Sequence, residues 1–213
     1  MMENEQYKEF WNFIKLLHEN DLLEHVIVVG SWAEYLYAQS GILKGFEANL
    51  RTLDIDFLIK NMRRPSKPKN FAAMVKDAGY TIEYDVLEET TKVYTPGLME
   101  IEFLIGQKGS GASRVIQTNF GVNAQALRHM SVLSENVENI EILGFTITVP
   151  SPEAYVAHKI VINKERNNKA EKDRSAILGI FPYMSKDKFK EICSNMTKKE
   201  GNVISDFLAE NEL

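Results

Sequence analysis

The stretch LDIDFLI at residues 53–59 decides the fold, because acidic residues alternate in it with large apolar ones. Side chains two apart along a strand point to the same face of the sheet. A strand here places Asp54 and Asp56 together and turns Ile55 and Phe57 toward apolar packing. Two neighbouring carboxylates repel each other, and burying them is costly unless a cation compensates their charge. The stretch therefore predicts a strand with one apolar face and one acidic, cation-seeking face.

A second acidic strand is predicted by LMEIEFLI at 98–105, where Glu100 and Glu102 share one face. If this strand lies beside the first, one of the two glutamates completes a cluster of three carboxylates. Hard divalent cations such as Mg²⁺ prefer oxygen ligands. Three acids suit two such ions about 4 Å apart, the arrangement used for in-line phosphoryl or nucleotidyl displacement. The alternative is that both motifs are solvent-facing acids on half-exposed strands.

A Gly-Ser turn lies between a strand and a helix upstream of these acids. HVIVVG at 25–30 is a β-branched run that indicates a buried strand, and SWAEYLYAQ at 31–39 has helical spacing. Glycine permits a close backbone approach, and a helix N-terminus attracts phosphate. Gly30 and Ser31 are therefore candidates for phosphate binding, with Ser31 as N-cap or as a hydroxyl donor to phosphate. An ordinary N-cap is the alternative, and the sequence contains neither a P-loop nor a dinucleotide-binding glycine series.

The rest of the chain is expected to alternate strands and helices up to Pro150 and to be helical beyond it. Apolar spacing and glycine or proline stops predict helices at 5–20, about 69–78 and 121–135, strands around 80–87 and 92–95, and a hairpin at 140–150. The expected class is α/β (α+β), with an α/β core over residues 1–150 and a C-terminal helical region over 151–213 that packs on it.

Composition limits the class of protein further. The 213 residues are 44% hydrophobic and 26% charged, as in a folded chain, and none of the apolar runs is long enough to span a bilayer. The net charge of -5 argues against a surface that wraps nucleic acid as a whole, although basic runs occur at 60–69 and 159–174. A single cysteine, Cys193, excludes an internal disulfide and indicates a cytoplasmic protein.

Taken in order, VVGSWAEYLY, TLDIDFLI and MEIEFLI resemble the nucleotidyltransferase superfamily that includes DNA polymerase β. Its pattern is a hydrophobic strand with Gly-Ser, an Asp-x-Asp strand and a later strand with one acid between hydrophobic residues. FGVNAQALRHMSVL and VPSPEAYVAHKIVINKER further resemble a bacterial branch akin to the transferases of abortive-infection toxin–antitoxin pairs. The resemblance implies a mixed twisted sheet flanked by helices.

Residue by residue, the resemblance assigns Gly30 and Ser31 to the triphosphate of an NTP such as ATP. It assigns Asp54 and Asp56 to two Mg²⁺ or Mn²⁺ ions. Glu102 matches the third acid, which also binds metal and helps to activate the incoming hydroxyl. Glu100 remains the alternative to Glu102.

Two features modify this assignment. GILKGFEANLR lengthens the gap between the Gly-Ser turn and the acids beyond that of compact family members, which puts catalytic competence in doubt. Downstream, a basic helix would bring Lys159, Arg166 and Asp173 to one face if it is continuous. The resemblance implies that Lys159 and Arg166 bind nucleotide, whereas a solvated face with i,i+4 pairs such as Lys169–Asp173 is the alternative.

The resulting hypothesis is a transferase that moves NMP from NTP to an acceptor hydroxyl and releases pyrophosphate. The acceptor is RNA, a protein or a small molecule. Two alternatives stay open: an RNA-modifying toxin that is neutralised by an antitoxin protein, and a non-catalytic module that binds nucleotide. Trp11 and Trp32 are expected to pack in the interior. The alternative concerns Trp32, which follows Ser31 directly and is the aromatic residue placed to lie near a nucleotide.

Overall fold

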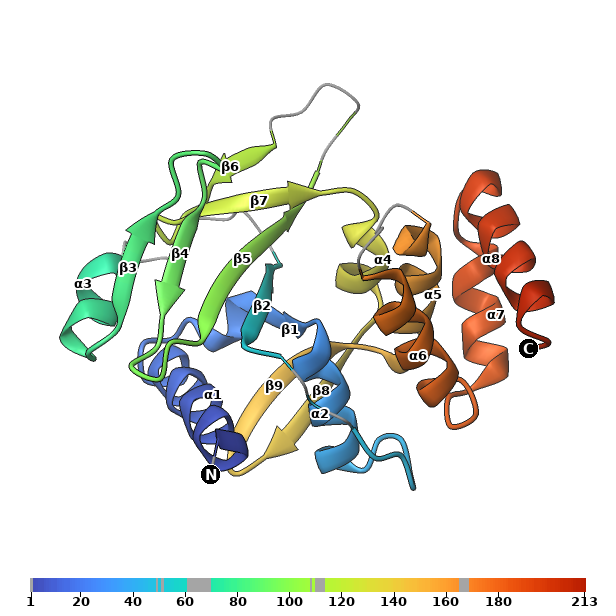
Figure 1. Ribbon diagram of the computed structural model, residues 1–213, viewed down its shortest axis with the longest axis horizontal. Coiled ribbons are helices and arrows are strands. Elements are labelled where there is room, and N and C mark those ends of the chain that lie inside the picture. The colour runs from blue at the N-terminus through green and yellow to red at the C-terminus, as the bar shows by residue number, and fades with distance from the viewer. Residues whose placement is uncertain are drawn as a thin grey trace.

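The computed structural model describes residues 2–48, 50, 52–60, 70–107, 109, 114–164 and 169–213, with side chains from residue 5 onward. Figure 1 shows a sheet with helices below it and a group of helices at one end. The strands are β1 Val26–Val29, β2 Asp54–Ile59, β3 Thr81–Tyr84, β4 Thr91–Tyr94, β5 Glu100–Gly106, β6 Val115–Gln117, β7 Asn123–Leu127, β8 Val137–Ile142 and β9 Phe145–Pro150. The helices are α1 Met2–Glu19, the 3₁₀ turn η1 Leu23–His25, α2 Ser31–Ser40, α3 Phe71–Asp77, α4 Met130–Glu135, α5 Pro152–Asn163, α6 Ala170–Ile180, α7 Lys186–Ser194 and α8 Lys198–Glu210.

Seven strands form one mixed sheet in the order β1-β2-β5-β4-β3, with β7 and β6 attached to the far half of β5. Strands β2 and β5 are parallel, as are β5 and β7, whereas the other pairs are antiparallel. Strand β4 pairs with the first residues of β5, and β7 takes over from Leu104 onward. The hairpin β8–β9 forms a separate two-stranded sheet. This mixed, helix-flanked sheet confirms the expected fold class.

The apolar face of the sheet lies against α1 and α3. Phe13 of α1 packs on Phe57 of β2 with ring centroids 5.5 Å apart, and Phe71 of α3 packs on Phe103 of β5 at 5.3 Å. The rings of Phe13 and Phe57 are fully buried. Because Ile55 and Phe57 alternate with the aspartates, burying these rings turns the acids toward the opposite face.

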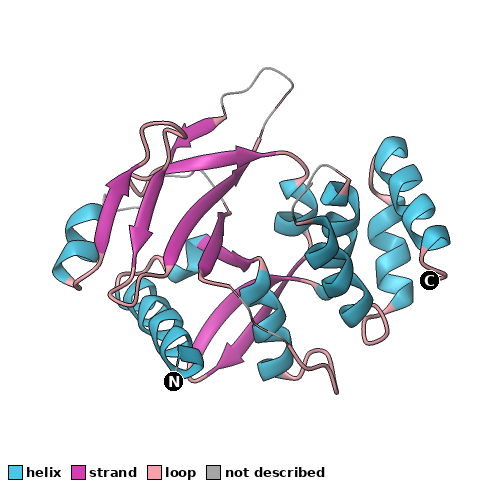
Figure 2. Cartoon of the chain, viewed as in Figure 1, coloured by secondary structure: helices cyan, strands magenta, loops and turns pink. Residues whose placement is uncertain are grey.

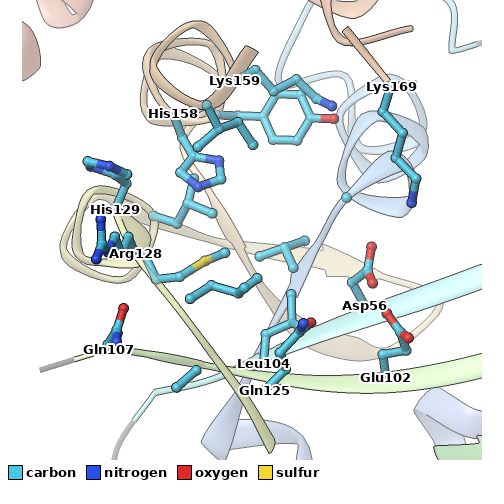
Figure 3. A pocket seen from close by; sticks show the side chains of 18 of the residues that line it. Asp56, Glu102, Leu104, Gln107, Gln125, Arg128, His129, His158, Lys159 and Lys169 are labelled. Atoms are coloured by element: carbon cyan, nitrogen blue, oxygen red, sulfur yellow. The ribbon is translucent and has the colours of Figure 1, made fainter. Parts of the chain in front are cut away.

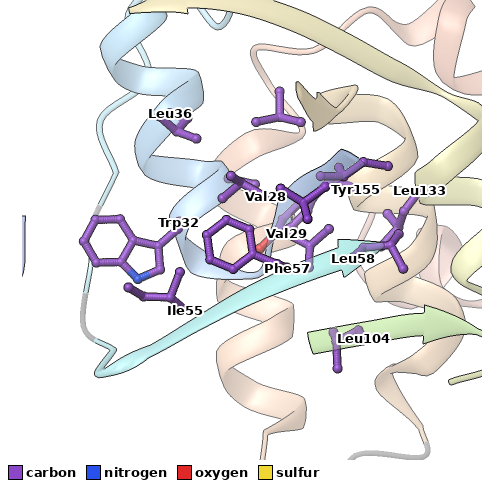
Figure 4. Close-up of a cluster of buried hydrophobic side chains, with 14 of the residues drawn as sticks. Val28, Val29, Trp32, Leu36, Ile55, Phe57, Leu58, Leu104, Leu133 and Tyr155 are labelled. Carbon is purple, nitrogen blue, oxygen red and sulfur yellow. The ribbon is translucent and has the colours of Figure 1, made fainter. Parts of the chain in front are cut away.

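Helix α2 joins this core through Trp32, which is fully buried and lies beside Ile55 (Figure 4). The indole stacks on the ring of Phe10 with centroids 4.2 Å apart. Its indole Nε1 donates to the backbone carbonyl of Asp54 at 3.1 Å. The position next to Ser31 therefore holds a packing residue, as the first of the two interpretations of Trp32 predicts. Helix periodicity turns this side chain inward, away from the acidic face.

The helix expected at 121–135 is only half present, because Asn123–Leu127 form strand β7 and only Met130–Glu135 form a helix, α4. Ala124 and Ala126 are buried and alternate with half-buried neighbours, which is a period of two. Pairing with β5 on one side and β6 on the other satisfies the backbone of this segment. Long-range pairing overrides the helical propensity of its alanines and leucine.

Four helices, α5 to α8, follow Pro150 at one end of the molecule (Figure 2). Ser151 caps α5 by accepting a hydrogen bond from the Ala154 amide, and Pro152 occupies the first turn. Residues 152–160 are buried on every side, so α5 is the central element of this end. Helix α5 ends at Asn163 and α6 begins at Ala170, so Lys159 and Asp173 belong to separate helices.

Candidate active site

The predicted acids lie on two adjacent parallel strands. Asp54 of β2 is in register with Glu100 of β5, and Asp56 is in register with Glu102. Residues directly opposite in register project from the same side of a sheet. The structure therefore brings Asp54, Asp56, Glu100 and Glu102 onto one face, which we call the acidic face.

The Gly-Ser turn touches this face directly. Gly30 has a φ of +67° and a ψ of -155°, and a β-carbon at this position would overlap the Asp56 carboxylate. Only glycine adopts this backbone without strain, and only glycine leaves room for the acid. Gly30 is the N-cap of α2 and Ser31 is the first helical residue, so the expectation of Ser31 as the N-cap is wrong. The amides at the start of α2 lie next to Asp56 as a consequence.

Lys92 of β4 distinguishes the two glutamates by how closely it contacts each of them. Its Nζ lies 2.7 Å from a carboxylate oxygen of Glu100 and 3.6 Å from one of Glu102, and Asp85 and Glu88 are also within 4 Å. The short contact with Glu100 raises the pKa of Lys92. Glu102 lines the cavity described below, whereas Glu100 does not. Lys92 thus holds Glu100 in an ion pair and leaves Glu102 facing the open side.

The carboxylates of the acidic face lie close enough to repel one another. Burial, repulsion from Asp56 and repulsion from Glu100 raise the pKa of Glu102 from 4.5 to about 7. Carboxylate oxygens are the ligands that Mg²⁺ and Mn²⁺ prefer, so the donor set fits such ions chemically. As placed, however, the side chains that the structure describes contain no group of three His, Cys, Asp or Glu that could hold a metal ion. The acidic face therefore fits a divalent cation by the type and charge of its donor atoms, and not by a ligand geometry that is already formed.

A cavity of about 650 Å³ opens above the acidic face, a volume in the range of small-molecule sites. Asp54, Asp56 and Glu102 line it from the sheet, and Gly30 lines it beside them. Figure 3 shows Asp56 and Glu102 on one side with Lys169 extending toward them, Lys159 and His158 above, and Arg128, His129 and Gln107 on the opposite side. The acidic face, the Gly-Ser turn and several basic groups therefore share one cavity.

Lys159 and Asp173 meet across α5 and α6. The Lys159 Nζ lies 2.6 Å from Oδ1 of Asp173, and the two residues are only 7% and 2% exposed. The same ammonium lies 5.0 Å from the ring of Tyr155, whose hydroxyl donates to Glu34 of α2. The expected shared face of Lys159, Arg166 and Asp173 on a continuous helix is wrong, because α5 and α6 are separate helices, and Arg166 lies outside the described residues. Packing of the two helices brings Lys159 and Asp173 together instead.

Other predicted site residues have different surroundings. Ser31 follows Gly30 but does not line the cavity, and Lys169 lines it from the start of α6. Of the basic run at 60–69, Lys60 donates to the hydroxyl of Thr148 at 2.7 Å, and residues 61–69 lie outside the described part of the chain. The alternative pair of Lys169 with Asp173 gives way to the ion pair of Lys159 with Asp173.

Several cavity residues had no signal in the sequence. Tyr155 and Gln125 line the cavity and lie in stretches quoted for the resemblance, which gave them no role, whereas Arg114 and Gln107 line it from outside any motif. Arg128 lies in the segment expected to be helical, so its position in the cavity wall depends on the turn after β7.

A mixed sheet with acids on two parallel strands beside a Gly-Ser turn defines the class as the nucleotidyltransferase fold of the DNA polymerase β type. The chain belongs to a nucleotidyltransferase family, whose sequence model matches residues 8–195. It is accordingly a transferase of nucleotidyl groups. No curated protein matches the sequence significantly.

Solved structures share this fold at low sequence identity. An antigenic nucleotidyltransferase-like protein from Paracoccidioides brasiliensis is 15% identical with a TM-score of 0.55, covering 95% of this chain and 88% of that one. ANT(2")-Ia in complex with adenylyl-2"-tobramycin is 13% identical with a TM-score of 0.53, covering 93% and 96% of the two chains. In the part of the chain that the structure describes, every helix is too short or too polar to cross a membrane.

Proposed function

We propose that the chain transfers NMP from an NTP to an acceptor hydroxyl in a reaction that depends on Mg²⁺ or Mn²⁺. The observation that carries this proposal is that Asp54, Asp56 and Glu102 line one cavity together with Gly30. Asp54, Asp56 and Glu102 would hold the divalent ions, which neutralise the triphosphate and lower the pKa of an attacking hydroxyl. The carboxylate donor set and the mutual repulsion of Asp56, Glu100 and Glu102 support this assignment, because a divalent cation would relieve that repulsion.

In the proposed reaction the acceptor oxygen forms a bond to the α-phosphorus of the NTP. The bond from that phosphorus to the oxygen bridging to the β-phosphate breaks, and pyrophosphate leaves. Glu102 accepts the proton of the hydroxyl, and the amides at Gly30 and Ser31 orient the phosphates from the start of α2. Catalysis then depends on positioning and charge stabilisation, since the chain forms no covalent intermediate.

We assign the two parts of the chain complementary roles. Residues 1–150 supply the acidic face and the Gly-Ser turn, and residues 151–213 supply the basic wall with Lys159 and Lys169. Because Asp173 neutralises most of the charge of Lys159, Lys169 is the more accessible cation of this wall. Arg166 stays a proposed nucleotide-binding residue from the resemblance alone.

The proposal is tested with each α-labelled NTP in turn, with Mg²⁺ or Mn²⁺, and with RNA, protein and small-molecule fractions of a cell extract. The small-molecule fraction is included because ANT(2")-Ia holds a nucleotidylated small molecule. Pyrophosphate release and label transfer are measured together, and the labelled fraction identifies the acceptor class.

Asp56→Asn should abolish both signals, because it removes one charge from the centre of the acidic face. Asp206→Asn, an exposed change on α8 outside the cavity, is the matched control and should leave them unchanged. Nucleotide binding without turnover against every fraction would contradict the proposal and favour the non-catalytic module. Label on RNA, together with growth arrest on expression that Asp56→Asn relieves, would instead identify the toxin.

A further inference from the structure

The end of the cavity away from the acids is basic, and the proposed reaction has not yet used it. Arg114 precedes β6, and Arg128 and His129 lie between β7 and α4; all three line the cavity. Figure 3 shows Arg128 and His129 on the side opposite Asp56 and Glu102. Among the residues that the structure describes, neither guanidinium is in an ion pair. We call Arg114, Arg128 and His129 the basic end.

The basic end is anchored by the C-terminal helices. His129 has a φ of +62°, and its Nδ1 lies 2.6 Å from Oε1 of Glu200. Burial raises the pKa of Glu200, but hydrogen bonds from Thr197 and His129 outweigh it and hold the pKa below its ordinary value. Glu200 is therefore ionised and can only accept, so the His129 Nδ1 donates to it. The capping box between Thr197 and Glu200 fixes the carboxylate in turn, which holds the turn at Arg128 in place.

Charge distinguishes the two ends of the cavity. The triphosphate fits the end where Gly30, the start of α2 and Lys169 surround the acids and their proposed metal ions. The ribose and base of a nucleotide carry no charge, so they give no reason for two unpaired guanidiniums farther along. The remaining component of the proposed reaction is the acceptor.

We infer that the acceptor carries a phosphate group, which the basic end binds while the acceptor hydroxyl faces Glu102. Guanidinium groups bind phosphate oxygens bidentately, and two of them lining one cavity match the two charges of a phosphate dianion. This inference rests on the proposed function and adds the chemical class of its second substrate. An RNA end and a small phosphorylated hydroxyl compound share this chemistry.

The test separates binding from turnover. The protein is first loaded with Mg²⁺ and a non-hydrolysable NTP analogue, and is then titrated calorimetrically with a trinucleotide RNA, with ribose 5-phosphate and with unphosphorylated ribose. At least one phosphorylated probe should bind and ribose should not. The probe that binds distinguishes the RNA source from the small-molecule source. If neither phosphorylated probe binds, or ribose binds equally well, the inference is overturned.

The residues are tested with the double variant Arg114→Gln/Arg128→Gln. It should weaken binding of the phosphorylated probe at least about tenfold, since two charge-assisted contacts are lost. Arg128→Lys, which keeps the charge without the planar fork, should recover part of the affinity. Lys8→Gln/Lys190→Gln removes two exposed charges outside the cavity and should change nothing. Weaker binding of the NTP analogue, with the acceptor probe unaffected, would assign the arginines to the triphosphate and overturn the inference.

The two proposals fail in different ways. If the wild-type protein neither releases pyrophosphate nor transfers label, the proposed function fails. If it transfers label to an acceptor that still works after its phosphate groups are removed enzymatically, only the inference about the basic end fails.

Discussion

At Gly30 the backbone conformation and the space around it impose the same requirement. The positive φ excludes most side chains, and the Asp56 carboxylate occupies the position that a β-carbon would take. A glycine at this point therefore serves both the turn and the acidic face. Gly201, in the middle of α8, has no atom within 4 Å of an added β-carbon and offers a matched comparison.

Gly30→Ala should destabilise the fold by about 1–3 kcal/mol for the backbone strain alone, and should reduce nucleotidyl transfer by displacing Asp56. Gly201→Ala should raise stability by up to about 1 kcal/mol, because alanine favours a helix over glycine. Chemical denaturation and pyrophosphate release measure both variants. Equal stability of Gly30→Ala and the wild type would contradict the close approach of Asp56.

The two glutamates of β5 should respond differently to removal of their charge. Glu102→Gln is expected to lower kcat/KM at least about a hundredfold, because Glu102 faces the cavity and accepts the proton in the proposed reaction. Glu100→Gln should have a much smaller effect, since Glu100 is held by Lys92 outside the cavity. Steady-state kinetics of the two isosteric variants make the comparison. The reverse order would identify Glu100 as the third acid.

Glu34 on α2 provides a test by pH. Burial raises its pKa above 4.5, although the hydrogen bond from Tyr155 and the charges of Lys159 and Lys172 oppose this. A carboxyl whose pKa is raised on folding binds its proton more tightly in the native state, so its contribution to stability is present below pH 4.5 and is lost as pH rises through the raised value. Glu34→Gln keeps an acceptor for Tyr155, and its free energy of unfolding should therefore decrease less than that of the wild type as pH rises. Denaturation at several pH values from 4 to 8 measures the slope, and parallel slopes would contradict the prediction.

At the scale of elements, α5 and α6 are joined by the buried ion pair of Lys159 with Asp173. Removing one partner leaves a buried charge uncompensated. Asp173→Asn should therefore cost about 3–5 kcal/mol of unfolding free energy, whereas the double variant Lys159→Met/Asp173→Leu should cost clearly less. Urea unfolding of the double variant and of Lys159→Met and Asp173→Leu alone forms the cycle, and Asp173→Asn is measured beside it. If the double variant loses as much as the sum of the single ones, the pair is not coupled.

Local sequence patterns are sufficient to predict some elements of this chain and insufficient for others. The strands β2 and β5 are predicted because acids and apolar residues alternate in their first half and an apolar run follows, a pattern typical of buried strands. The alanines and leucine of Asn123–Leu127 predict a helix, whereas the strand that forms there depends on pairing with β6 and with the more distant β5. The sequence does not decide between one continuous helix and the two helices α5 and α6, for a related reason. The polar residues after Ile162 either continue a helix or end it, depending on packing.

At the scale of the molecule, the cavity lies between the sheet and the C-terminal helices, so a ligand contacts both parts of the chain. Binding to the native state alone raises stability by about 2.7 kcal/mol at a hundredfold excess over Kd. An NTP with Mg²⁺ should therefore raise the thermal midpoint, and adenosine without phosphates should not. Asp56→Asn should remove the part of the shift that requires Mg²⁺. Differential scanning fluorimetry measures the shift, and an equal shift with adenosine would exclude recognition of the triphosphate.

The sequence by itself determined the acidic faces of β2 and β5, the glycine turn before α2 and the helical character after Pro150, because periodicity and glycine chemistry act over a few neighbouring residues. Only the tertiary structure decided that Lys92 holds Glu100 and leaves Glu102 to the cavity, that Asp173 neutralises Lys159, and that Arg128 and His129 face the acids. These contacts join residues that are 10 or more positions apart or lie on different elements. They depend on strand order and helix packing, which local side-chain patterns do not encode.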